Sequence, residues 1–434
     1  MTSFKARRSN LFNLMANNSV AVLHAASILH RNSDTEFPFR QDSYFYYLSG
    51  FNESNALIVL SKKEGTQKFI IFCQDKDPIA EQWTGPRAGI KGACEMFGAD
   101  EAYPINLVDE KIPNLLANTD CVYYLTGLNK HFDNKLFTWV ENLRKKIRQG
   151  QNAPRQFFDL RQLLDEQRLI KSDTEITLMQ KAASISTLAH QRAIEQCEVG
   201  MHEYTLEGIL LNEFYRQGAR YPAYPCIVAS GNNACTLHYT QNNAVIKDGD
   251  LVLIDAGAEY DNYAADITRT FPANGKFSAP QRAIYELVLA SQLAAINEVK
   301  PGVLWDAMQN KILSVIVQGL IDLKILKGEL KTLIEEKAYL PFYMHNSGHW
   351  LGMDVHDVGE YKVHNQWRAL STNMVFTVEP GIYISQTNTS VDEKWRGIGV
   401  RIEDDVIVTQ NGFEVLTQVA KAPQEIEKLM QKRA

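Results

Sequence analysis

The sequence has few cysteines, no long apolar run and no excess of positive charge. Six cysteines are scattered over 434 residues, and no two of them form a C-x-x-C pair. This spacing argues against a zinc knuckle, a redox dithiol or a disulfide framework, and it favours a reducing, cytoplasmic compartment. No apolar run has the length that a bilayer requires. The formal net charge of −6 disfavours a nucleic-acid surface, which would be basic. We therefore expect neither a membrane nor a nucleic acid as a partner.

The first part of the chain mixes strands and helices. The segment "SVAVL" predicts a first strand, and "NALIVLSKKEGTQKFIIF" predicts a hairpin around a Lys-Lys-Glu-Gly turn. A further strand is expected at "DCVYYL". The segment "NKLFTWVENLRKKIRQG" predicts a helix that ends at Gly150.

The character of the sequence changes near residue 170. Ser172 and Glu175 form a capping box ahead of a helical apolar stripe. From there the order helix, helix, strands occurs twice, and the strands pair as antiparallel neighbours. We therefore predict an α+β protein with two domains. Residues 1–170 form an α/β domain, and residues 171–434 form a domain of antiparallel strands with covering helices.

Four acidic residues occupy positions where a strand rarely accepts a charge. Asp255 ends the apolar run "LVLID", and Asp266 interrupts "AADIT". Glu379 stands just before a proline that stops its strand, and Glu403 shares a strand face with Arg401. Each position by itself also fits a turn cap or an Arg–Glu pair. Together they are harder to dismiss, because buried charges are paired or bind metal.

Histidines crowd the segment "MHNSGHWLGMDVHDVGE". It contains His345, His349 and His356, three of the ten histidines in the chain. An even distribution would put about 0.3 histidines in a window of twelve residues. Such a cluster fits a metal site, a catalytic site or a set of satisfied core histidines.

The charges of these residues suit a pair of divalent cations. Asp255, Asp266, Glu379 and Glu403 together carry four negative charges, which two divalent ions would balance. His349 would add a neutral nitrogen ligand. Oxygen donors with one imidazole suit Mn²⁺, Fe²⁺ or Co²⁺, with Zn²⁺ also compatible. Two such ions roughly 3.5–4 Å apart share carboxylates and activate water, which points to hydrolysis.

Four sequence blocks resemble the motifs of a known family. These blocks resemble the motifs of the pita-bread metallopeptidases in order and spacing. They are "LIDAGAEYDNYAADITRTF", "HNSGHWLGMDVHDVG", "TVEPGIYI" and "GIGVRIEDDVIVT". Within that family the chain resembles the Xaa-Pro aminopeptidases, or aminopeptidases P. Their N-terminal domain is resembled by "FPFRQDSYFYYLSGF" and "EQWTGPRAG", so the resemblance spans nearly the whole chain. The stretch "HNSGHW" departs from the glycine- or threonine-containing forms typical of this group.

The resemblance implies a centre of two divalent metal ions, and the oxygen-rich ligand set favours Mn²⁺. It also implies an enzyme that releases the first residue of peptides with proline second, and a homodimer or homotetramer. The implied terminal ligand of one metal is Asp255, the bridging ligands are Asp266 and Glu403, and the ligands of the other metal are His349 and Glu379.

The same resemblance assigns roles in catalysis and substrate binding. His356 would stabilise the tetrahedral intermediate, His238 would hydrogen-bond the substrate backbone, and Glu379 would relay a proton. His345 matches a residue that lines the proline pocket, although a satisfied core histidine is an equally good interpretation. Arg401, Tyr383 and Trp83 are further substrate contacts. For the remaining histidines we expect structural or surface roles: His24, His30, His131, His190, His202 and His364.

Other functions remain open at this level. A prolidase shares all five ligands but cleaves only X-Pro dipeptides. A methionine aminopeptidase needs no long N-terminal domain. A non-catalytic pita-bread binding protein, or a creatinase-like hydrolase without metal, typically lacks ligands that this sequence retains.

Overall fold

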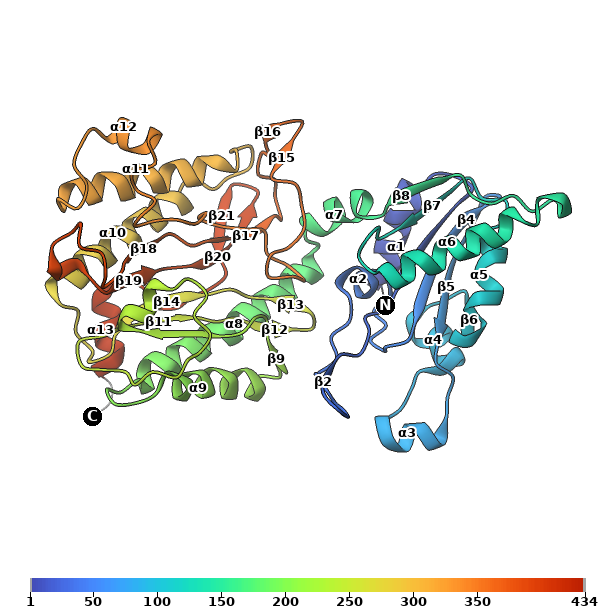
Figure 1. Ribbon diagram of the computed structural model, residues 1–434, viewed down its shortest axis with the longest axis horizontal. Coiled ribbons are helices and arrows are strands. Elements are labelled where there is room, and N and C mark those ends of the chain that lie inside the picture. The colour runs from blue at the N-terminus through green and yellow to red at the C-terminus, as the bar shows by residue number, and fades with distance from the viewer. Residues whose placement is uncertain (1, 432–434) are drawn as a thin grey trace. The chain divides into compact units, whose positions relative to one another are not determined.

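The structure is a computed structural model that describes residues 2–431. The chain forms two compact units (Figure 1). Unit 1 extends to Gln167 and unit 2 begins at Arg168. No helix among the described residues is long and apolar enough to span a membrane.

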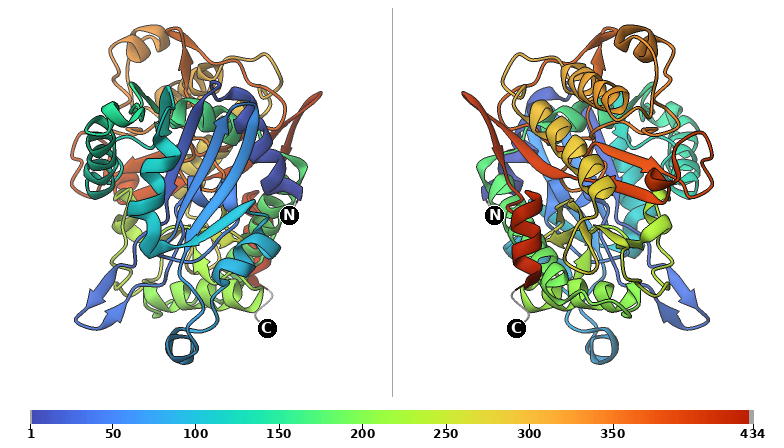
Figure 2. Two further views of the ribbon diagram at one scale, coloured as in Figure 1. Left: turned by 90° about the vertical axis from the view of Figure 1, so that its right-hand side faces the viewer. Right: turned by 90° about the vertical axis from the view of Figure 1, so that its left-hand side faces the viewer.

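Unit 1 is built on one six-stranded sheet with the strand order β6-β5-β4-β1-β7-β8 (Figure 2, left). The pairs β1–β4 and β4–β5 are antiparallel, whereas β1–β7, β7–β8 and β5–β6 are parallel. Helices α5 and α6 supply apolar side chains to the core on one face of this sheet. The strands are β1 (Ser19–His24), β4 (Leu57–Lys63), β5 (Thr66–Cys73), β6 (Glu101–Pro104), β7 (Cys121–Tyr124) and β8 (Gln156–Asp159), and a small hairpin is formed by β2 (His30–Asn32) and β3 (Thr35–Glu36). The helices are α1 (Thr2–Leu14), α2 (Ser43–Ser49), α3 (Pro78–Thr84), α4 (Gly89–Phe97), α5 (Val108–Leu116) and α6 (Lys130–Arg144).

The expected strands of unit 1 are present. The hairpin β4–β5 turns at Glu64 and Gly65, which both have positive φ angles, of 49° and 73°. This backbone suits a two-residue hairpin turn. Helix α6, by contrast, ends at Arg144, and a 3₁₀ helix follows before Gly150. The prediction that α6 continues to Gly150 was wrong, because the next apolar residue, Ile147, is 60% exposed and does not hold a further helical turn against the core.

Unit 2 contains helices α8 (Asp173–Gln196) and α9 (Glu203–Arg216), then strands, then α10 (Ala279–Ile296) and α11 (Asp306–Asp322), then strands again. The first set of strands is β9 (Tyr221–Pro222), β10 (Ile227–Ser230), β11 (Leu251–Asp255), β12 (Ala258–Tyr260), β13 (Tyr263–Ala264) and β14 (Thr268–Pro272). The second set is β15 (Lys362–Val363), β16 (Gln366–Trp367), β17 (Val375–Val378), β18 (Gly381–Ile384), β19 (Ile398–Arg401), β20 (Asp404–Thr409) and β21 (Gly412–Val415). The remaining helices are α7 (Arg161–Leu169), which crosses the boundary between the units, α12 (Leu330–Glu335) and α13 (Pro423–Gln431).

The strand pairs of unit 2 are antiparallel, in sheets such as β10-β11-β14 and β17-β20-β21. Helix α8 packs against β12 and β13, and α10 packs against β17, β18 and β19. Figure 1 shows the two helix pairs covering the strands. The capping box at Ser172 is present, and its hydroxyl lies 2.7 Å from Glu175 Oε2. The prediction of an α+β protein is confirmed.

Candidate metal centre

Three of the four predicted acidic residues lie at strand ends of unit 2 or directly beside them. Asp255 is the last residue of β11, where it faces Ile227 of β10 and Thr268 of β14. Glu379 directly follows β17, as the proline after it requires. Glu403 lies in the two-residue break between β19 and β20. A carboxylate at a strand end can leave the hydrogen-bonded ladder and still remain largely buried.

The prediction that Asp266 lies inside a strand was wrong. It lies between β13 and β14, and its N–H donates to both carboxylate oxygens of Asp405, at 3.1 and 3.2 Å. The strand predicted to carry both Arg401 and Glu403 is also interrupted, because β19 pairs with β18 whereas β20 pairs with β17, and Glu403 lies between them. At each break the backbone N–H donates to a residue distant in the sequence instead of continuing a regular strand pairing. The Asp266 N–H donates to Asp405, and the Glu403 N–H donates to the Thr268 carbonyl. Such distant partners could not be predicted from the local sequence.

His349 is held by the strand that carries Glu379. Its N–H donates to Thr377 Oγ1 at 3.1 Å, and the Thr377 N–H donates to the His349 carbonyl at 3.0 Å. The Nδ1 atom of His349 lies 3.1 Å from the Trp350 carbonyl oxygen. The opposite ring nitrogen, Nε2, therefore faces the acids, 3.5 Å from both Asp266 Oδ2 and Glu379 Oε1. This orientation leaves one imidazole nitrogen for a ligand role.

Three of the five predicted ligands converge closely. Asp266, His349 and Glu403 each offer a ligand atom, and these atoms lie within 4.8 Å of one another. Asp255 is connected to this group by Tyr224, whose hydroxyl lies 2.6 Å from Asp255 Oδ1 and also contacts Asp266 Oδ1. The fold thus gathers residues that are more than 100 positions apart in the chain.

The acids strongly perturb one another. Burial raises the pKa of Glu379 to about 7, and the negative charges of Asp266 and Asp255 contribute to this rise. Burial and the same neighbouring carboxylates also raise the pKa of Glu403. The pKa of His349 is about 9, because Asp266 and Glu379 outweigh the effect of burial.

This arrangement fits two divalent cations. Like charges crowded into a buried site are costly unless a cation compensates them. The donors are carboxylate oxygens and one imidazole nitrogen, a set suited to Mn²⁺, Fe²⁺, Co²⁺ or Zn²⁺. Neighbouring side chains orient these donors, as Thr268 does by donating its hydroxyl to Glu403 Oε2 at 2.6 Å.

A chain of hydrogen bonds joins the predicted substrate contacts to the acids. His345 Nε2 lies 2.8 Å from the Tyr383 hydroxyl, which also accepts a hydrogen bond from Arg401 Nη1 at 3.1 Å. Arg401 Nη2 then donates to Asp255 Oδ2 at 2.5 Å. Burial lowers the pKa of His345 to about 4, and the charges of Arg401 and His238 contribute to this decrease. The structure therefore places these residues beside the acidic cluster.

The other two predicted histidines are exposed and lie nearby. The ring of His356 is 4.2 Å from the ring of His349, centroid to centroid, at an interplanar angle of 65°. His238 lies in the loop after β10, close enough for its charge to contribute to lowering the pKa of His356, to which burial and the charge of His349 contribute more. Trp83, in contrast, belongs to helix α3 of unit 1, where it is 84% exposed. All other predicted site residues are in unit 2.

With this geometry established, known proteins provide an independent comparison. The model of metallopeptidase family M24 matches residues 177–410, and the model of the aminopeptidase P N-terminal domain matches residues 4–124. The Xaa-Pro aminopeptidases of Haemophilus influenzae and Escherichia coli are 46% and 45% identical to this chain, over 98% of its length and 96% and 97% of theirs. The chain belongs to metallopeptidase family M24.

Solved structures agree with this assignment. An aminopeptidase from Pseudomonas aeruginosa is 51% identical, with a TM-score of 0.98 over 99% of this chain and 98% of that one. A zinc-substituted aminopeptidase P of Escherichia coli in complex with product has 44% identity and a TM-score of 0.97, over 99% of this chain and 98% of that one. The predicted resemblance is confirmed. These comparisons support a metal-dependent aminopeptidase and do not favour the prolidase alternative.

The sequence patterns did not identify several residues that hold the site together. Tyr224 joins two acids, Thr268 donates to Glu403, Thr377 positions His349, and Asp405 receives the Asp266 N–H. The run Glu-Asp-Asp at 403–405 could have indicated Asp405, because three consecutive acids in an apolar strand are unusual. The other three residue types are common in strands and turns.

A buried ionic cluster lies beside His356. The two carboxylate oxygens of Asp357 contact Arg168 Nη2 at 2.6 Å and Lys171 Nζ at 3.0 Å. All three side chains are only 1% exposed. Arg168 also contacts Asp354, whose side chain is 38% exposed, at 2.8 Å.

Asp357→Asn is expected to lower the free energy of unfolding at pH 7 by about 3–5 kcal/mol, because it removes the buried anion that two buried cations share. Burial alone would raise the pKa of Asp357, but Lys171 and Arg168 hold it below its ordinary value. The stabilisation is therefore complete above the unfolded-state pKa of about 3.9, and it is lost as the pH falls through the lower folded-state pKa. Urea unfolding of chelator-treated wild type and variant between pH 7 and pH 3 measures the difference.

Asp354→Asn is the matched control, because its partly exposed contact with the same arginine should contribute no more than about 1 kcal/mol. Equal destabilisation by the two substitutions, or a difference that grows toward pH 3, would contradict the ionic account of Asp357.

Proposed function

We propose that this protein is a dinuclear metal-dependent Xaa-Pro aminopeptidase, which releases the first residue of peptides that have proline second. The observation that carries the proposal is the convergence of Asp266, His349 and Glu403 within 4.8 Å in a chain of metallopeptidase family M24. The Xaa-Pro aminopeptidases that cover nearly the full length of this chain support the same reaction.

Five residues would hold the two ions. Asp255 would be the terminal ligand of one ion, His349 and Glu379 would bind the other, and Asp266 and Glu403 would serve both. We propose Mn²⁺ as the native metal, because the donors are mostly hard carboxylate oxygens. When bound, the ions would polarise the scissile carbonyl and activate water.

The remaining side chains would act directly on the peptide. His356 faces the centre from an exposed loop, where it can donate a hydrogen bond to the oxyanion that develops on the scissile carbonyl. Glu379 would pass a proton to the leaving proline nitrogen. His238 would hold the substrate backbone, and Arg401 would fix Asp255 near the free amine of the first residue.

The choice of proline follows from the chemistry of its amide. The nitrogen of an X-Pro bond carries no hydrogen, so a peptidase has no N–H to recognise there. His345 and Tyr383 would instead shape a pocket for the proline ring. Their contact is a hydrogen bond of 2.8 Å between His345 Nε2 and the Tyr383 hydroxyl. Trp83 is a further proposed substrate contact.

We also propose a cytoplasmic location, which is supported by six free cysteines.

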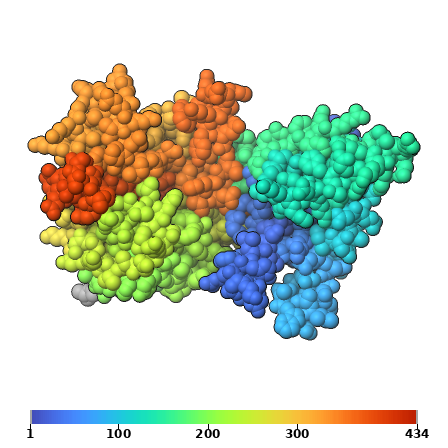
Figure 3. All heavy atoms as spheres, in the orientation of Figure 1, coloured from blue at the N-terminus to red at the C-terminus, as the bar shows by residue number. Residues whose placement is uncertain are grey.

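The resemblance to the Xaa-Pro aminopeptidases is the basis on which we propose a homodimer or homotetramer. Helix α3, which projects from the rest of unit 1 in Figure 3, has no buried residue, and its Ile79 and Trp83 are 73% and 84% exposed. A second copy of the chain would cover this apolar surface.

Residues 1–170 and 171–434 remain the proposed domains.

Metal-free protein is expected to be inactive, and Mn²⁺ is expected to restore activity better than Zn²⁺ or Co²⁺. The restored enzyme should cleave an X-Pro-Y tripeptide at least about tenfold faster than the X-Pro dipeptide, because a site built for a longer chain leaves contacts unmade with a shorter one. Release of the first residue, measured as kcat/KM with metal content per chain, tests both expectations.

An X-Ala-Y tripeptide is the control for proline selectivity. Preference for the dipeptide would favour a prolidase, and preference for X-Ala-Y would contradict proline specificity. Full activity after exhaustive chelation, with no metal by elemental analysis, would exclude the metal-dependent reaction.

A further inference from the structure

A buried carboxylate at the start of helix α9 accepts five hydrogen bonds. Glu203 is fully buried. Its Oε1 accepts from the N–H and hydroxyl of Ser230, at 2.7 and 2.8 Å, and from Asn233 Nδ2 at 3.0 Å. Its Oε2 accepts from the Tyr239 hydroxyl at 2.8 Å and from the Ala244 N–H at 2.9 Å. All five donors are neutral groups, so the carboxylate is held by hydrogen bonds alone.

These donors lie on both sides of His238 in the sequence. The 231–244 loop begins with a short 3₁₀ helix, Gly231–Cys235, and contains no strand. Oε1 binds the residues where this loop starts, and Oε2 binds the residues where it returns. A side chain on an irregular loop has no ladder to fix it, so tethers of this kind set its position. One carboxylate thus closes the base of the loop that carries His238.

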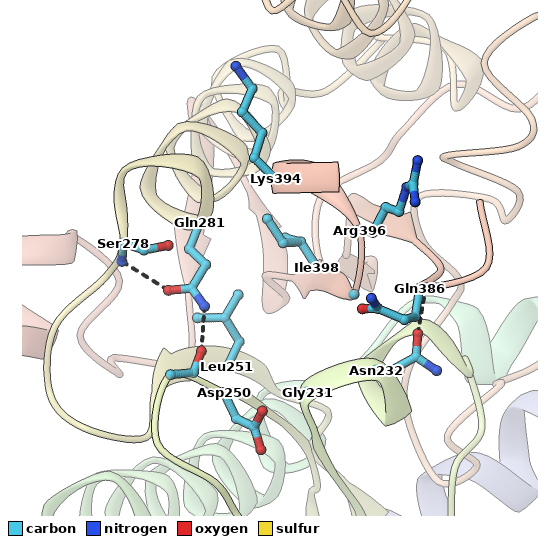
Figure 4. Close-up of a pocket in the computed structure, with 12 residues that line it drawn as sticks. Gly231, Asn232, Asp250, Leu251, Ser278, Gln281, Gln386, Lys394, Arg396 and Ile398 are labelled. Carbon is cyan, nitrogen blue, oxygen red and sulfur yellow. Dashed lines mark hydrogen bonds between the residues drawn. The ribbon is translucent and has the colours of Figure 1, made fainter. Parts of the chain in front are cut away.

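Other contacts attach the same loop to its surroundings. Asn242 donates to Glu207 Oε2 at 3.0 Å, one helical turn beyond Glu203 on α9. Figure 4 shows the hydrogen bond, of 2.8 Å, from the Gln386 N–H to Asn232 at the start of the loop. Asn232 and Gln386 line a pocket together with Leu251, which lies at the opposite end of β11 from Asp255. Ala234 packs in an apolar cluster with Tyr383 of the candidate site.

We propose that Glu203 is a positioning residue for His238. The inference rests on the proposed function, in which His238 holds the substrate backbone. A carboxylate accepts on both oxygens, and hydrogen bonds to an ionised acceptor are about twice as strong as neutral ones. Glutamine has the same shape but offers one oxygen and one NH₂ group. In Glu203→Gln one side of the loop base therefore meets a donor where it needs an acceptor, and His238 moves away from the substrate.

Glu203→Gln in the full-length, metal-loaded enzyme is expected to lower kcat/KM for an X-Pro-Y tripeptide by about 10- to 100-fold, the effect of a small misplacement of a binding group. Metal content per chain should stay at the wild-type value, because Glu203 contacts none of the proposed ligands. The split of the loss between kcat and KM should match that of His238→Ala. Glu207→Gln is the matched control: its remaining oxygen still accepts from Asn242, so kcat/KM should stay within about twofold of wild type.

A double-mutant cycle separates positioning from general damage. In a His238→Ala background, Glu203→Gln should lower kcat/KM by less than about twofold, since the residue through which it acts is gone. The milder Tyr239→Phe, which removes one donor and keeps the ring, should show the same dependence on His238 if Glu203→Gln folds poorly.

Two outcomes would overturn the positioning role while X-Pro-Y cleavage by the wild type stands. One is wild-type turnover in both Glu203→Gln and Tyr239→Phe, and the other is an equal fold-loss with and without His238. Failure of the metal-loaded wild type to cleave X-Pro-Y would instead refute the proposed function.

Discussion

Asp266→Ala is expected to release both metal ions and to abolish peptide cleavage. Asp266 lies 3.5 Å from His349 and shares the hydroxyl of Tyr224 with Asp255, so its carboxylate is placed between the other ligand candidates. Without a bridging carboxylate, neither ion retains a full ligand set, and the remaining acids repel each other. The loss of metal affinity and activity should exceed the roughly 10- to 100-fold loss that follows removal of a residue that only orients a metal ligand.

Metal per chain by elemental analysis, measured beside kcat for an X-Pro-Y tripeptide, tests this expectation. Asp261→Asn is the control, because it removes an exposed carboxylate five positions away, and asparagine tolerates the positive φ of 49° found there. It should keep both ions and normal turnover. Two metals per chain in Asp266→Ala would refute the bridging role.

The second large effect separates a ligand from a catalyst within one loop. His349→Ala should lose metal, because it removes the single nitrogen donor among the five proposed ligands. His356→Ala should keep its metal and lose about a hundred- to a thousandfold in kcat, the effect of removing one donor to an oxyanion. The two rings are only 4.2 Å apart, so a local folding defect would affect both variants alike.

His131→Ala provides the control, since His131 is exposed near the start of α6 in unit 1 and alanine suits a helix. It should match wild type in metal content and kcat. Should His356→Ala release its metal as readily as His349→Ala, or retain full turnover, the proposed division of roles would be wrong.

Local sequence patterns predicted much of this protein. The apolar run "LVLID" predicted a strand that ends at Asp255, and Pro380 predicted where the strand before Glu379 stops. The capping box at Ser172 predicted the start of α8, and a Glu-Gly turn predicted the hairpin β4–β5. Each of these features depends on residues a few positions apart, whose preferences act before any distant contact forms. Order and spacing of the motifs were also sufficient for the family.

Only the tertiary structure decided how the candidate site is held together. Asp266 leaves its strand because Asp405, 139 positions away, accepts its N–H. Glu203 binds Ser230, which lies 27 residues later and directly before the loop that carries His238, and Asp357 contacts Arg168 across 189 residues. Such partners leave no periodic trace in the sequence, because hydrogen bonds and ion pairs between distant segments depend on where the packed core brings their backbones. The sequence by itself determined which residues could bind metal, and packing determined which neighbours orient them.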